Sequence, residues 1–445
     1  MRKMKDSGVE WIGEIPDDWE IRRIKHIATL AGRIGWQGLT SDEYTDEGAF
    51  LITGVDFRNG RICWDTCVHV PMSRWEEATQ IQIKEGDLLI TKDGTVGKVA
   101  IAENVPGETS LNSGVLLIRN IDECDTKFLF WMIQSEVFWK WFGIINAGNS
   151  TIIHLYQHSF DNFSFPYPES YTQRRMANYL DIKCSKIDSI IAKQEQIIKK
   201  LKEYKLSVIT EAVTKGLNPD VEMKDSGVEW IGKIPLTWTK CRVKNIYKNI
   251  KNPVKVGPFG SQLTTTDYVE EGKWVYNQRV VLDHNFKDND TFISEEKYQE
   301  MKGFAVEEGD ILITTRGTGT TGHIAKVPSD FKEGILHPCL MRIRLDENKC
   351  LYKFLYYAFE FGTYIREQID FANNTSSLPV LYSYTLNDLF IAIPPVEVQK
   401  EIIDYLDARV ESIDKRIDNF TSTINKLREY KKSLIYEVVT GKKEV

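Results

Sequence analysis

One segment of the sequence occurs twice. MKDSGVEWIGEIPDDW at residues 4–19 returns as MKDSGVEWIGKIPLTW at residues 223–238, and 13 of the 16 positions are identical. Chance does not produce a match of this length within 445 residues, so the chain is one unit written twice. Any fold proposed for it must therefore place the same frame in both halves.

Further matching islands keep the two copies in step. EGDLLITKDG at 85–94 corresponds to EGDILITTRG at 308–317, and LKEYK at 201–205 corresponds to LREYK at 427–431. The offset grows from 219 (4 to 223) to 226 (201 to 427), so the second copy carries a few extra loop residues. Between the islands the copies differ almost completely. This pattern suggests one scaffold that presents two different surfaces.

The end of each copy predicts a long helix. In the second copy, apolar residues from Val410 to Leu427 recur at gaps of 3, 4, 3, 4 and 3, which is the 3.5-residue period of a coiled coil. Each helix could pack on its own globular domain, but a shared seam favours antiparallel pairing of the two. Gln194 is the polar residue of the seam, and we interpret it as fixing the register. The expected seam residues are Ile187, Ile191, Gln194, Ile198, Leu201, Ile413, Ile417, Phe420, Ile424 and Leu427.

Between leader and helix, each copy carries a segment rich in Gly, aromatic and β-branched residues. The EGDLLIT and EGDILIT runs predict strands at 85–91 and 308–314. The aromatic-rich runs at 127–142 and 352–369 predict amphipathic helices whose aromatic faces we expect in the core. The segments therefore indicate globular domains of mixed α/β (α+β) structure.

The repeat also sets the expected domain boundaries. We expect a leader with a first globular domain at 1–168, a central long helix at 169–217, a second leader and globular domain at 218–395, and a C-terminal long helix at 396–441. The predicted fold class is mixed α/β (α+β), with two globular domains separated by two long antiparallel coiled-coil helices. A pseudo-two-fold axis should relate the two copies.

Composition narrows the classes of partner. The formal net charge of −7 argues against a general nucleic-acid binder. However, residues 171–217 hold ten Lys and Arg against five Asp and Glu, and electrostatic footprints are local. The N-terminus has no apolar signal region, and no apolar run approaches the roughly 18 residues of a membrane span. We therefore expect a cytoplasmic protein with no membrane partner.

A glycine motif follows the second copy of the repeated strand. Gly317, Gly319 and Gly322 spell GxGxxG, but a dinucleotide fingerprint must open a helix. Here HIAKVP follows, and Pro328 ends the run. We expect instead a tight strand–turn–strand with exposed backbone.

Neither the histidines nor the cysteines suggest a metal site. His154 and His158 stand four apart, but the sequence offers them no HExxH pattern and no evident third ligand. Cys63 and Cys67 lie close together with no second pair, and seven cysteines fit reduced thiols better than disulfides. P-loop, GxSxG and aminomethyltransferase motifs are also missing. We expect no metal site and no catalytic residue.

Polar loops are the expected surfaces for contact with nucleic acid. The loop after the first strand differs between the copies, AGRIGWQGLT at 31–40 against KVGPFGSQLT at 255–264. Gln, Ser and Arg side chains can read base edges, and exposed turn amides beside Lys or Arg suit phosphate. Ordinary surface loops are the alternative. The candidate DNA-contact residues are Arg33, Trp36, Gln37, Lys92, Lys98, Ser150, Lys255, Ser261, Gln262, Arg316, Thr318 and Ser376.

Taken together, these motifs resemble a known family. The SGVEWIGEIPxxW leader, the EGDLLIT strand, a Pro-rich approach with Gln173 or Gln399 into a long helix, and LKEYK or LREYK near its end resemble the specificity subunit of type I restriction-modification systems. GPFGSQL at 257–263 is similar to a frequent opening of a target recognition domain. The resemblance covers essentially the whole chain in the right order.

The resemblance implies a function. Each variable segment would be a target recognition domain that reads one half of a bipartite, asymmetric site in double-stranded DNA, and the coiled coil would set the spacer. Two methyltransferase (modification) subunits would bind S-adenosylmethionine and methylate adenine. Restriction/translocase subunits would use ATP and Mg for translocation and cleavage. The chain itself would be non-catalytic, without a cofactor of its own, in the cytoplasm of a bacterium or archaeon.

Two other functions stay open from the residues alone. A tandem coiled-coil scaffold without DNA recognition would have the same repeat and the same seam. A nucleotide-dependent enzyme would use the glycine turn at 317–322. Salt-sensitive, sequence-selective DNA binding excludes the first, and lack of nucleotide binding excludes the second.

Overall fold

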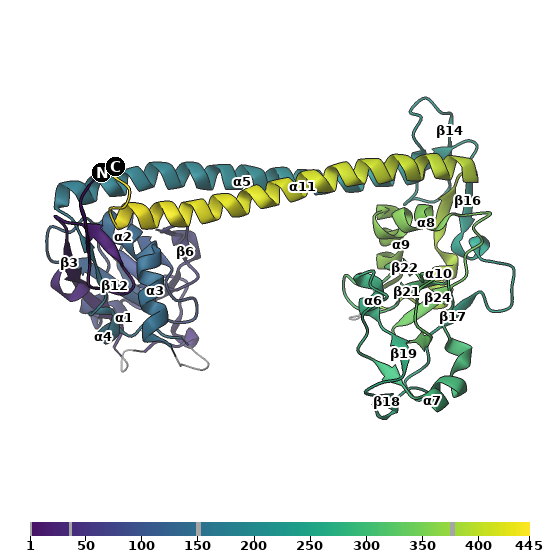
Figure 1. The fold of residues 1–445 in the computed structure, drawn as a ribbon, viewed down its shortest axis with the longest axis horizontal. Coiled ribbons are helices and arrows are strands. Elements are labelled where there is room, and N and C mark those ends of the chain that lie inside the picture. The colour runs from purple at the N-terminus through teal and green to yellow at the C-terminus, as the bar shows by residue number, and fades with distance from the viewer. Residues whose placement is uncertain (1, 35–37, 148–152, 374–378) are drawn as a thin grey trace. The chain divides into compact units, whose positions relative to one another are not determined.

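The computed structural model divides the chain into two compact units (Figure 1). One unit comprises residues 1–195 and 421–445, and the other comprises residues 196–420. The residues that the structure describes are 2–34, 38–147, 153–373 and 379–445. Both units mix sheets with helices, and each contains part of both long helices.

The first unit is built on two sheets. The larger has the order β4-β12-β9-β10-β7-β6, and its pairs are antiparallel except for β10 with β7. Its central strand β9 is buried at every residue, which explains why LLIT reads as a continuous apolar run. The strands are β4 (Ala28–Gly32), β12 (Val115–Asn120), β9 (Leu88–Thr91), β10 (Val99–Ile101), β7 (Arg61–Ile62) and β6 (Phe57–Arg58), with β11 (Thr109–Leu111), β5 (Ala49–Ile52) and β8 (Val68–Val70) in the second sheet.

The second unit is built on two corresponding sheets, which differ from those of the first unit in their number of strands. The strand that corresponds to β9 is β21 (Ile311–Thr314), which is again buried throughout. It lies in a sheet of order β17-β24-β21-β22, beside a second sheet of order β18-β20-β19-β23. The other strands are β17 (Val254–Val256), β24 (Leu340–Ile343), β22 (Ile324–Lys326), β18 (Tyr268–Val269), β20 (Phe292–Ile293), β19 (Lys273–Tyr276) and β23 (Gly334–Leu336).

The aromatic helices are shorter than the sequence predicts. The run at 127–142 forms two helices, α2 (Thr126–Gln134) and α3 (Glu136–Ile145). Ser135 separates them, because its backbone is extended and its hydroxyl accepts the Val137 N–H as an N-cap. Their aromatic residues lie mainly in the core, where Phe128, Phe138 and Trp141 are buried.

The second aromatic run breaks in the same way. It gives α8 (Tyr352–Glu360) and α9 (Thr363–Asn373). A Cβ at Gly362, between them, would lie 2.4 Å from the Ala358 carbonyl oxygen, so the turn requires glycine. The remaining short helices are α1 (Met72–Glu76), α4 (Gln157–Phe160), α6 (Gln278–Leu282), α7 (Glu295–Glu300) and α10 (Ser383–Asp388).

The duplicated leader forms the same hairpin in both copies. In the first copy Met4 pairs with Pro16, and in the second Met223 pairs with Pro235. The hairpin strands are β1 (Met4–Asp6) with β2 (Glu14–Pro16), and β14 (Met223–Asp225) with β15 (Lys233–Pro235). After each leader, a strand pairs with the strand that precedes the long helix: β3 (Glu20–Arg23) with β13 (Ser164–Tyr167), and β16 (Thr239–Arg242) with β25 (Phe390–Ile393).

Each leader rests on the end of the other copy's long helix. Tyr436, near the end of α11 (Val396–Val439), donates a hydrogen bond to the Ile12 carbonyl at 3.1 Å. The chain termini therefore lie together (Figure 1). In the second unit, the buried Trp238 packs against Gly216, just after α5 (Ser170–Lys215). Each leader is thus held against the end of a long helix, and the first leader joins residues that are distant in the sequence.

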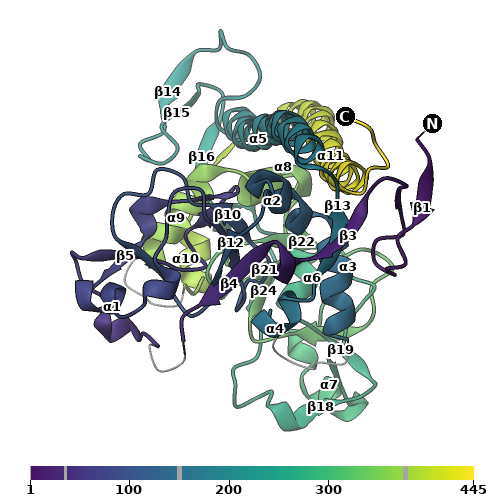
Figure 2. The same cartoon turned by 90° about the vertical axis from the view of Figure 1, so that its left-hand side faces the viewer.

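The two long helices lie side by side (Figures 1 and 2), and their ion pairs show that they run antiparallel. In the first unit, Lys431 pairs with Asp188 at 2.6 Å and Arg428 with Glu195 at 2.8 Å. In the second unit, Lys205 pairs with Asp414 at 2.7 Å. Residue numbers rise along α5 as those of their partners fall along α11, which defines the antiparallel direction.

The seam residues are the least exposed of their stretches. Ile187, Ile191, Ile413 and Ile424 are buried, and the other seam positions are half-buried. Gln194 Oε1 is buried with no hydrogen-bond partner among the described residues. A polar seam residue of this kind costs stability, and its role in fixing the register stays a prediction. No helix in the described ranges is long and apolar enough to cross a membrane.

Candidate nucleic-acid interface

In the first unit, one edge of the larger sheet gathers the predicted loops. β4 ends at Gly32 and β9 ends at Thr91, while their common neighbour β12 begins at Val115. Because these strands are adjacent and antiparallel to β12, the loops that follow β4 and β9 leave from the same edge. A Cβ at Gly32 would lie 3.9 Å from Lys92 Nζ, so the two loops meet there.

The second unit gathers the corresponding loops in the same way. The Gly257 N–H donates to the Leu340 carbonyl at 2.8 Å, and the Thr315 N–H donates to the Cys339 carbonyl at 2.9 Å. The GPFGSQL loop therefore starts beside the glycine turn that follows β21. The structure thus brings together two loops that lie about 60 residues apart in the sequence, 257–263 and 316–322.

The glycine turn of the second unit is held by side chains around it. The Arg316 carbonyl accepts bonds from Gln278 Nε2 and Thr320 Oγ1, both at 3.0 Å. The Gly317 carbonyl accepts from Thr321 Oγ1 at 2.8 Å, and Arg366 donates to the Thr321 carbonyl. The Arg316 and Thr318 side chains remain exposed. The turn is therefore a fixed platform for Arg316 and Thr318.

His323 links this turn to the neighbouring helix α8. His323 Nδ1 lies 2.6 Å from Glu360 Oε2, and its Nε2 lies 3.2 Å from the Gly319 carbonyl oxygen. Both partners accept hydrogen bonds, so they favour the imidazolium, which carries two N–H donors. The bond to Glu360 raises the pKa of His323 above its ordinary value. Through these two contacts, His323 connects the turn to α8.

The first unit carries a matching turn with different side chains. Lys92 aligns with Thr315, and Asp93 aligns with Arg316, so the cations of the two turns differ by one position. Lys92 is half-buried, whereas Lys98 is exposed and donates from Nζ to the Gly54 carbonyl at 3.2 Å. Asp93 Oδ1 lies 2.5 Å from His154 Nδ1. One frame therefore presents two different surfaces.

Arg33 corrects one expectation. Its side chain is buried, with Nε donating to the Leu111 carbonyl at 2.8 Å and Nη2 to Ser110 Oγ at 3.0 Å. Burial also lowers the pKa of its guanidinium. Because the guanidinium is committed to β11 inside the domain, Arg33 braces the two sheets and does not face outward.

The other loop candidates are more accessible. Lys255 is half-buried, with Nζ 4.2 Å from the centre of the Phe304 ring. Ser261 and Gln262 are exposed, and Gln262 Oε1 accepts the Phe259 N–H at 3.1 Å. The remaining candidates, Trp36, Gln37, Ser150 and Ser376, lie outside the described residues.

This edge also carries an exposed aromatic group that was not predicted from the sequence. Tyr382 and Tyr384 stack with their ring centres 5.3 Å apart and their planes 8° apart. They follow Leu381, whose N–H donates to the Thr315 carbonyl at 2.8 Å. A signal was available, because Leu-Tyr-x-Tyr at 381–384 repeats Leu-Tyr-x-His at 155–158 with the shared offset of 226 (155 to 381).

A buried glutamine fixes the globular part of each copy, which we call its recognition segment, to the long helix that follows it. Gln173 Oε1 accepts the Asp125 N–H at 2.9 Å, and Nε2 donates to the Pro168 carbonyl at 2.8 Å. Gln399 makes the matching bond with the Leu351 N–H at 2.8 Å. Both glutamines are fully buried. The glutamine of the family-like pattern is therefore the joint between globular segment and helix.

An ion pair strengthens the same joint in each copy. In the first, Asp181 accepts hydrogen bonds from Lys127 and from Trp131 Nε1, both at 2.8 Å. In the second, Asp407 accepts from Lys353 and from the Tyr357 hydroxyl. The indole and the phenol thus perform the same task with different chemistry. Both copies keep a charged and an aromatic donor on one helical carboxylate.

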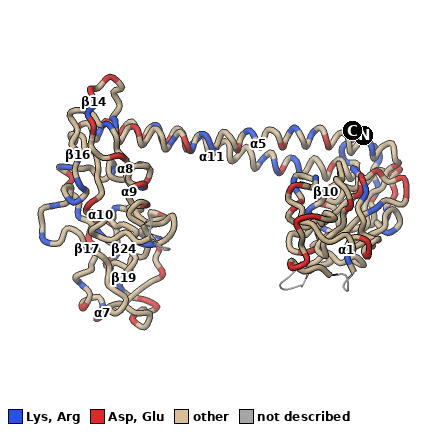
Figure 3. The backbone as a smooth tube through the Cα atoms, turned by 180° about the vertical axis from the view of Figure 1, so that it is seen from behind, with Lys and Arg blue, Asp and Glu red and all other residues tan. Residues whose placement is uncertain are grey.

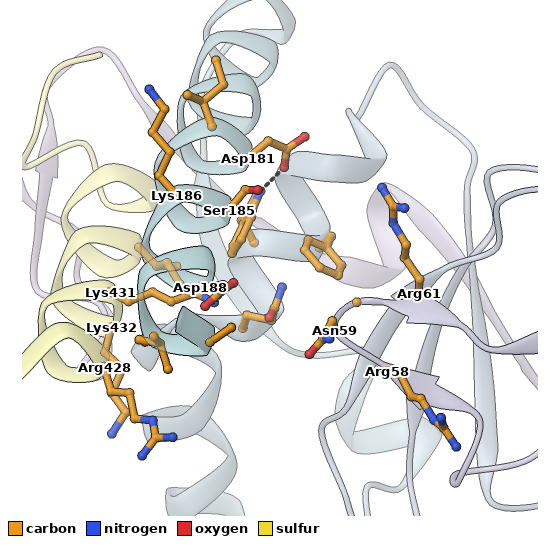
Figure 4. A pocket seen from close by; sticks show the side chains of 18 of the residues that line it. Arg58, Asn59, Arg61, Asp181, Ser185, Lys186, Asp188, Arg428, Lys431 and Lys432 are labelled. Carbon is orange, nitrogen blue, oxygen red and sulfur yellow. Dashed lines mark hydrogen bonds and ion pairs between the residues drawn. The ribbon is translucent and has the colours of Figure 1, made fainter. Parts of the chain in front are cut away.

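A groove lies next to this joint in the first unit (Figure 4). It has a volume of about 1550 Å3, with Arg58, Asn59 and Arg61 of the β6–β7 turn on one side and the long helices on the other. Many of its charges are matched internally, as in Lys431 with Asp188. Basic and acidic residues likewise alternate along both long helices (Figure 3). The groove is therefore a weak candidate for an anionic ligand.

The described residues do not form a cluster of metal ligands. Across the described ranges, no group of three or more His, Cys, Asp and Glu side chains could hold a metal ion. The seven cysteines are all free thiols. The glycine turn at 317–322 is followed by β22 and not by a helix, as the sequence predicts.

Comparisons with known proteins agree with this architecture. The family model described as "Type I restriction modification DNA specificity domain" matches residues 16–203 and 260–424. The putative type I restriction enzyme MjaX specificity subunit of Methanocaldococcus jannaschii is 24% identical over 443 residues, covering 97% of this chain and 95% of the relative. The type I restriction enzyme StySPI specificity subunit of Salmonella potsdam is 22% identical over 437 residues, covering 94% and 88%.

A solved structure shares the fold. A chain from a structural study of the assembly and conformational transition of the type I R-M system superposes with a TM-score of 0.72 at 14% identity, covering 96% of this chain and 98% of that one. The two matched domains and the two long helices confirm the predicted fold class.

Proposed function

The chain belongs to the type I restriction modification DNA specificity family, and from this membership we propose that it selects the DNA sequence for a type I restriction-modification complex. Each recognition segment reads one half of a bipartite, asymmetric site in double-stranded DNA. The chain is the non-catalytic subunit of the complex. Partner subunits methylate adenine at the selected site and cleave DNA that lacks the modification.

One observation carries this proposal. The two units present corresponding loops at the same edge of the corresponding sheet, but they fill the edge with different side chains. Where the second unit exposes Arg316, the first has Asp93 paired with His154 at 2.5 Å. Since donors, acceptors and charge at a reading edge decide which bases it accepts, two edges of unlike chemistry support two unlike half-sites.

The acidity of the chain supports a shared DNA interface. A net charge of −7 gives a weak field for attracting DNA phosphates. We assign much of the backbone contact to two methyltransferase subunits, which carry S-adenosylmethionine. Restriction/translocase subunits carry ATP and Mg. In this assignment the complex works in the cytoplasm of a bacterium or archaeon.

The long helices supply the spacer in this proposal. Each recognition segment is fixed to its helix by a buried glutamine and a helical carboxylate, Gln173 with Asp181 and Gln399 with Asp407. A rigid joint at both segments makes helix length the quantity that determines half-site separation. An α-helix adds 1.5 Å per residue.

An exchange of recognition segments tests the function. Residues 20–155 are replaced by the corresponding segment of another family member, and the complex with partner methyltransferase is used to methylate a library of DNA sites. One half-site should change while the other half and the spacer stay the same. The matched exchange of residues 239–381 should change only the other half. A change in both halves from either exchange contradicts the proposal.

A further inference from the structure

The stacked tyrosines of the second unit stand beside Arg316. Tyr382 is 52% exposed and Tyr384 is 66% exposed. Val380, two residues earlier, forms a β-bridge with Arg316. The aromatic pair and the exposed guanidinium therefore lie on adjoining stretches of backbone.

The backbone under the pair is fixed. The Leu381 N–H donates to the Thr315 carbonyl at 2.8 Å, and the Gly317 N–H donates to the Pro379 carbonyl at 3.3 Å. Leu381 and Leu386 are buried, so they anchor the segment on both sides of the pair. The segment is therefore anchored in the core on both sides of the rings, and the exposed rings project from a fixed backbone.

An exposed, stacked pair suits binding. Tyrosine offers a large amphipathic surface with few rotatable bonds, so little conformational entropy is lost when it is covered. Stacking at 5.3 Å with planes 8° apart already sets the ring orientation. Burying such rings removes apolar area from water, and their hydroxyls can stay at the wet rim.

The first unit fills the same place with aromatic rings as well. The Leu155 N–H donates to the Lys92 carbonyl at 3.0 Å, which matches the bond of Leu381. Tyr156, which is 53% exposed, lies between His154 and His158, with ring centres 5.8 and 5.6 Å away. The recognition segments share little sequence, yet both expose aromatic rings here.

We propose that Tyr382 and Tyr384 contact base edges of the second half-site through their rings, and that Tyr156 does the same for the first. This inference rests on the proposed function, because it takes duplex DNA as the occupant. The neighbouring Arg316 favours a polyanion over an apolar protein surface. Ring contacts with groups such as the thymine methyl read sequence without adding charge.

The test uses the complex of the full chain with partner methyltransferase. Tyr382→Ala/Tyr384→Ala is compared with Tyr382→Phe/Tyr384→Phe, which keeps the rings and removes the hydroxyls. Tyr171→Ala is the matched control, because Tyr171 is 67% exposed on α5 and belongs to the other compact unit. Affinity for the target, its salt dependence and methylation of a randomised second half-site are measured for each. Thermal unfolding checks that each variant folds.

The alanine variant should bind the target about 5- to 150-fold more weakly, the range for loss of a base contact. It should accept more bases at one or two positions of the second half-site, with the first half-site and the salt slope unchanged. The phenylalanine and Tyr171→Ala variants should resemble wild type. Tyr156→Ala should relax the first half-site instead.

Three results would overturn the inference: wild-type selectivity in the alanine variant, an equal loss in the phenylalanine variant, or a loss that is uniform over all sequences. The second would indicate contacts through the hydroxyls, and the third would indicate contacts that do not read sequence. If the wild-type complex itself selected no sequence, the proposed function would fail before the tyrosines were tested.

Discussion

Replacing Gln399 by leucine should destabilise the second unit strongly. The Gln399 side chain is fully buried and makes three hydrogen bonds, with the Leu351 N–H at 2.8 Å, the Lys349 carbonyl at 2.8 Å and the Pro394 carbonyl at 2.9 Å. Leucine has a similar volume but can satisfy none of these groups. The substitution therefore removes polar pairing while leaving the packing nearly intact.

The magnitude follows from the groups left unpaired. A buried donor or acceptor without a partner costs about 1–3 kcal/mol. Three such groups set the expected loss at about 3 kcal/mol or more. Gln173→Leu breaks the bonds with the Asp125 N–H and the Pro168 carbonyl, so it should cost at least about 2 kcal/mol. The two losses should add, because the sites lie in different compact units.

Urea unfolding followed by tryptophan fluorescence measures these losses. Gln196→Leu is the control, because Gln196 is an exposed glutamine on α5 and its replacement should change stability by no more than about 0.5 kcal/mol. A loss below about 1 kcal/mol for Gln399→Leu, at an unchanged m-value, would refute the reasoning. The glutamine would then not be the joint between the recognition segment and its helix.

Three further predictions concern DNA contact, spacing and symmetry. Lys92→Ala and Arg316→Ala should each weaken DNA binding by the complex by about 1–3 kcal/mol if the residue contacts a base. If it contacts a phosphate, the salt slope should fall by about one. Wild-type affinity and salt slope in both variants would contradict the assignment. Four residues inserted after Gln194 lengthen the helix by about 6 Å, so the methylated site should gain one or two base pairs of spacer at a rise of about 3.4 Å each; an unchanged spacer in an active variant would contradict the ruler. Residues 1–218 alone should sediment as a dimer that directs methylation of a palindromic site, because Trp19 of one copy can pack on Gly216 of the other as Trp238 does here; a folded monomer would contradict the symmetry.

The architecture was predictable because its signals are periodic and local. A repeat needs no three-dimensional knowledge to be seen, and the 3.5-residue spacing from Val410 to Leu427 identified the helices that the structure confirms. The helix break at Ser135 was missed, because the surrounding apolar run looks continuous. Its cap function depends on an extended backbone that the sequence alone does not reveal.

The site was predictable only in part. The glycine turns and the first loops were predicted to be contact surfaces, since their composition marks them as exposed, and their role in contact stays a prediction. Arg33 was misplaced, because its burial depends on Leu111 and Ser110, which lie almost 80 residues away in the sequence. The tyrosine pair was missed for a similar reason, because its exposure depends on the bond between Leu381 and Thr315.

Mapping of methylated adenines in a host that carries this chain with its partner methyltransferase tests the central claim most directly. The account predicts one bipartite motif with two different half-sites, a fixed spacer and a methylated adenine in each half. The motif should disappear when the chain is deleted and the methyltransferase is kept. Methylation of a short continuous site, or methylation that persists without the chain, would contradict the assignment of sequence selection to this subunit.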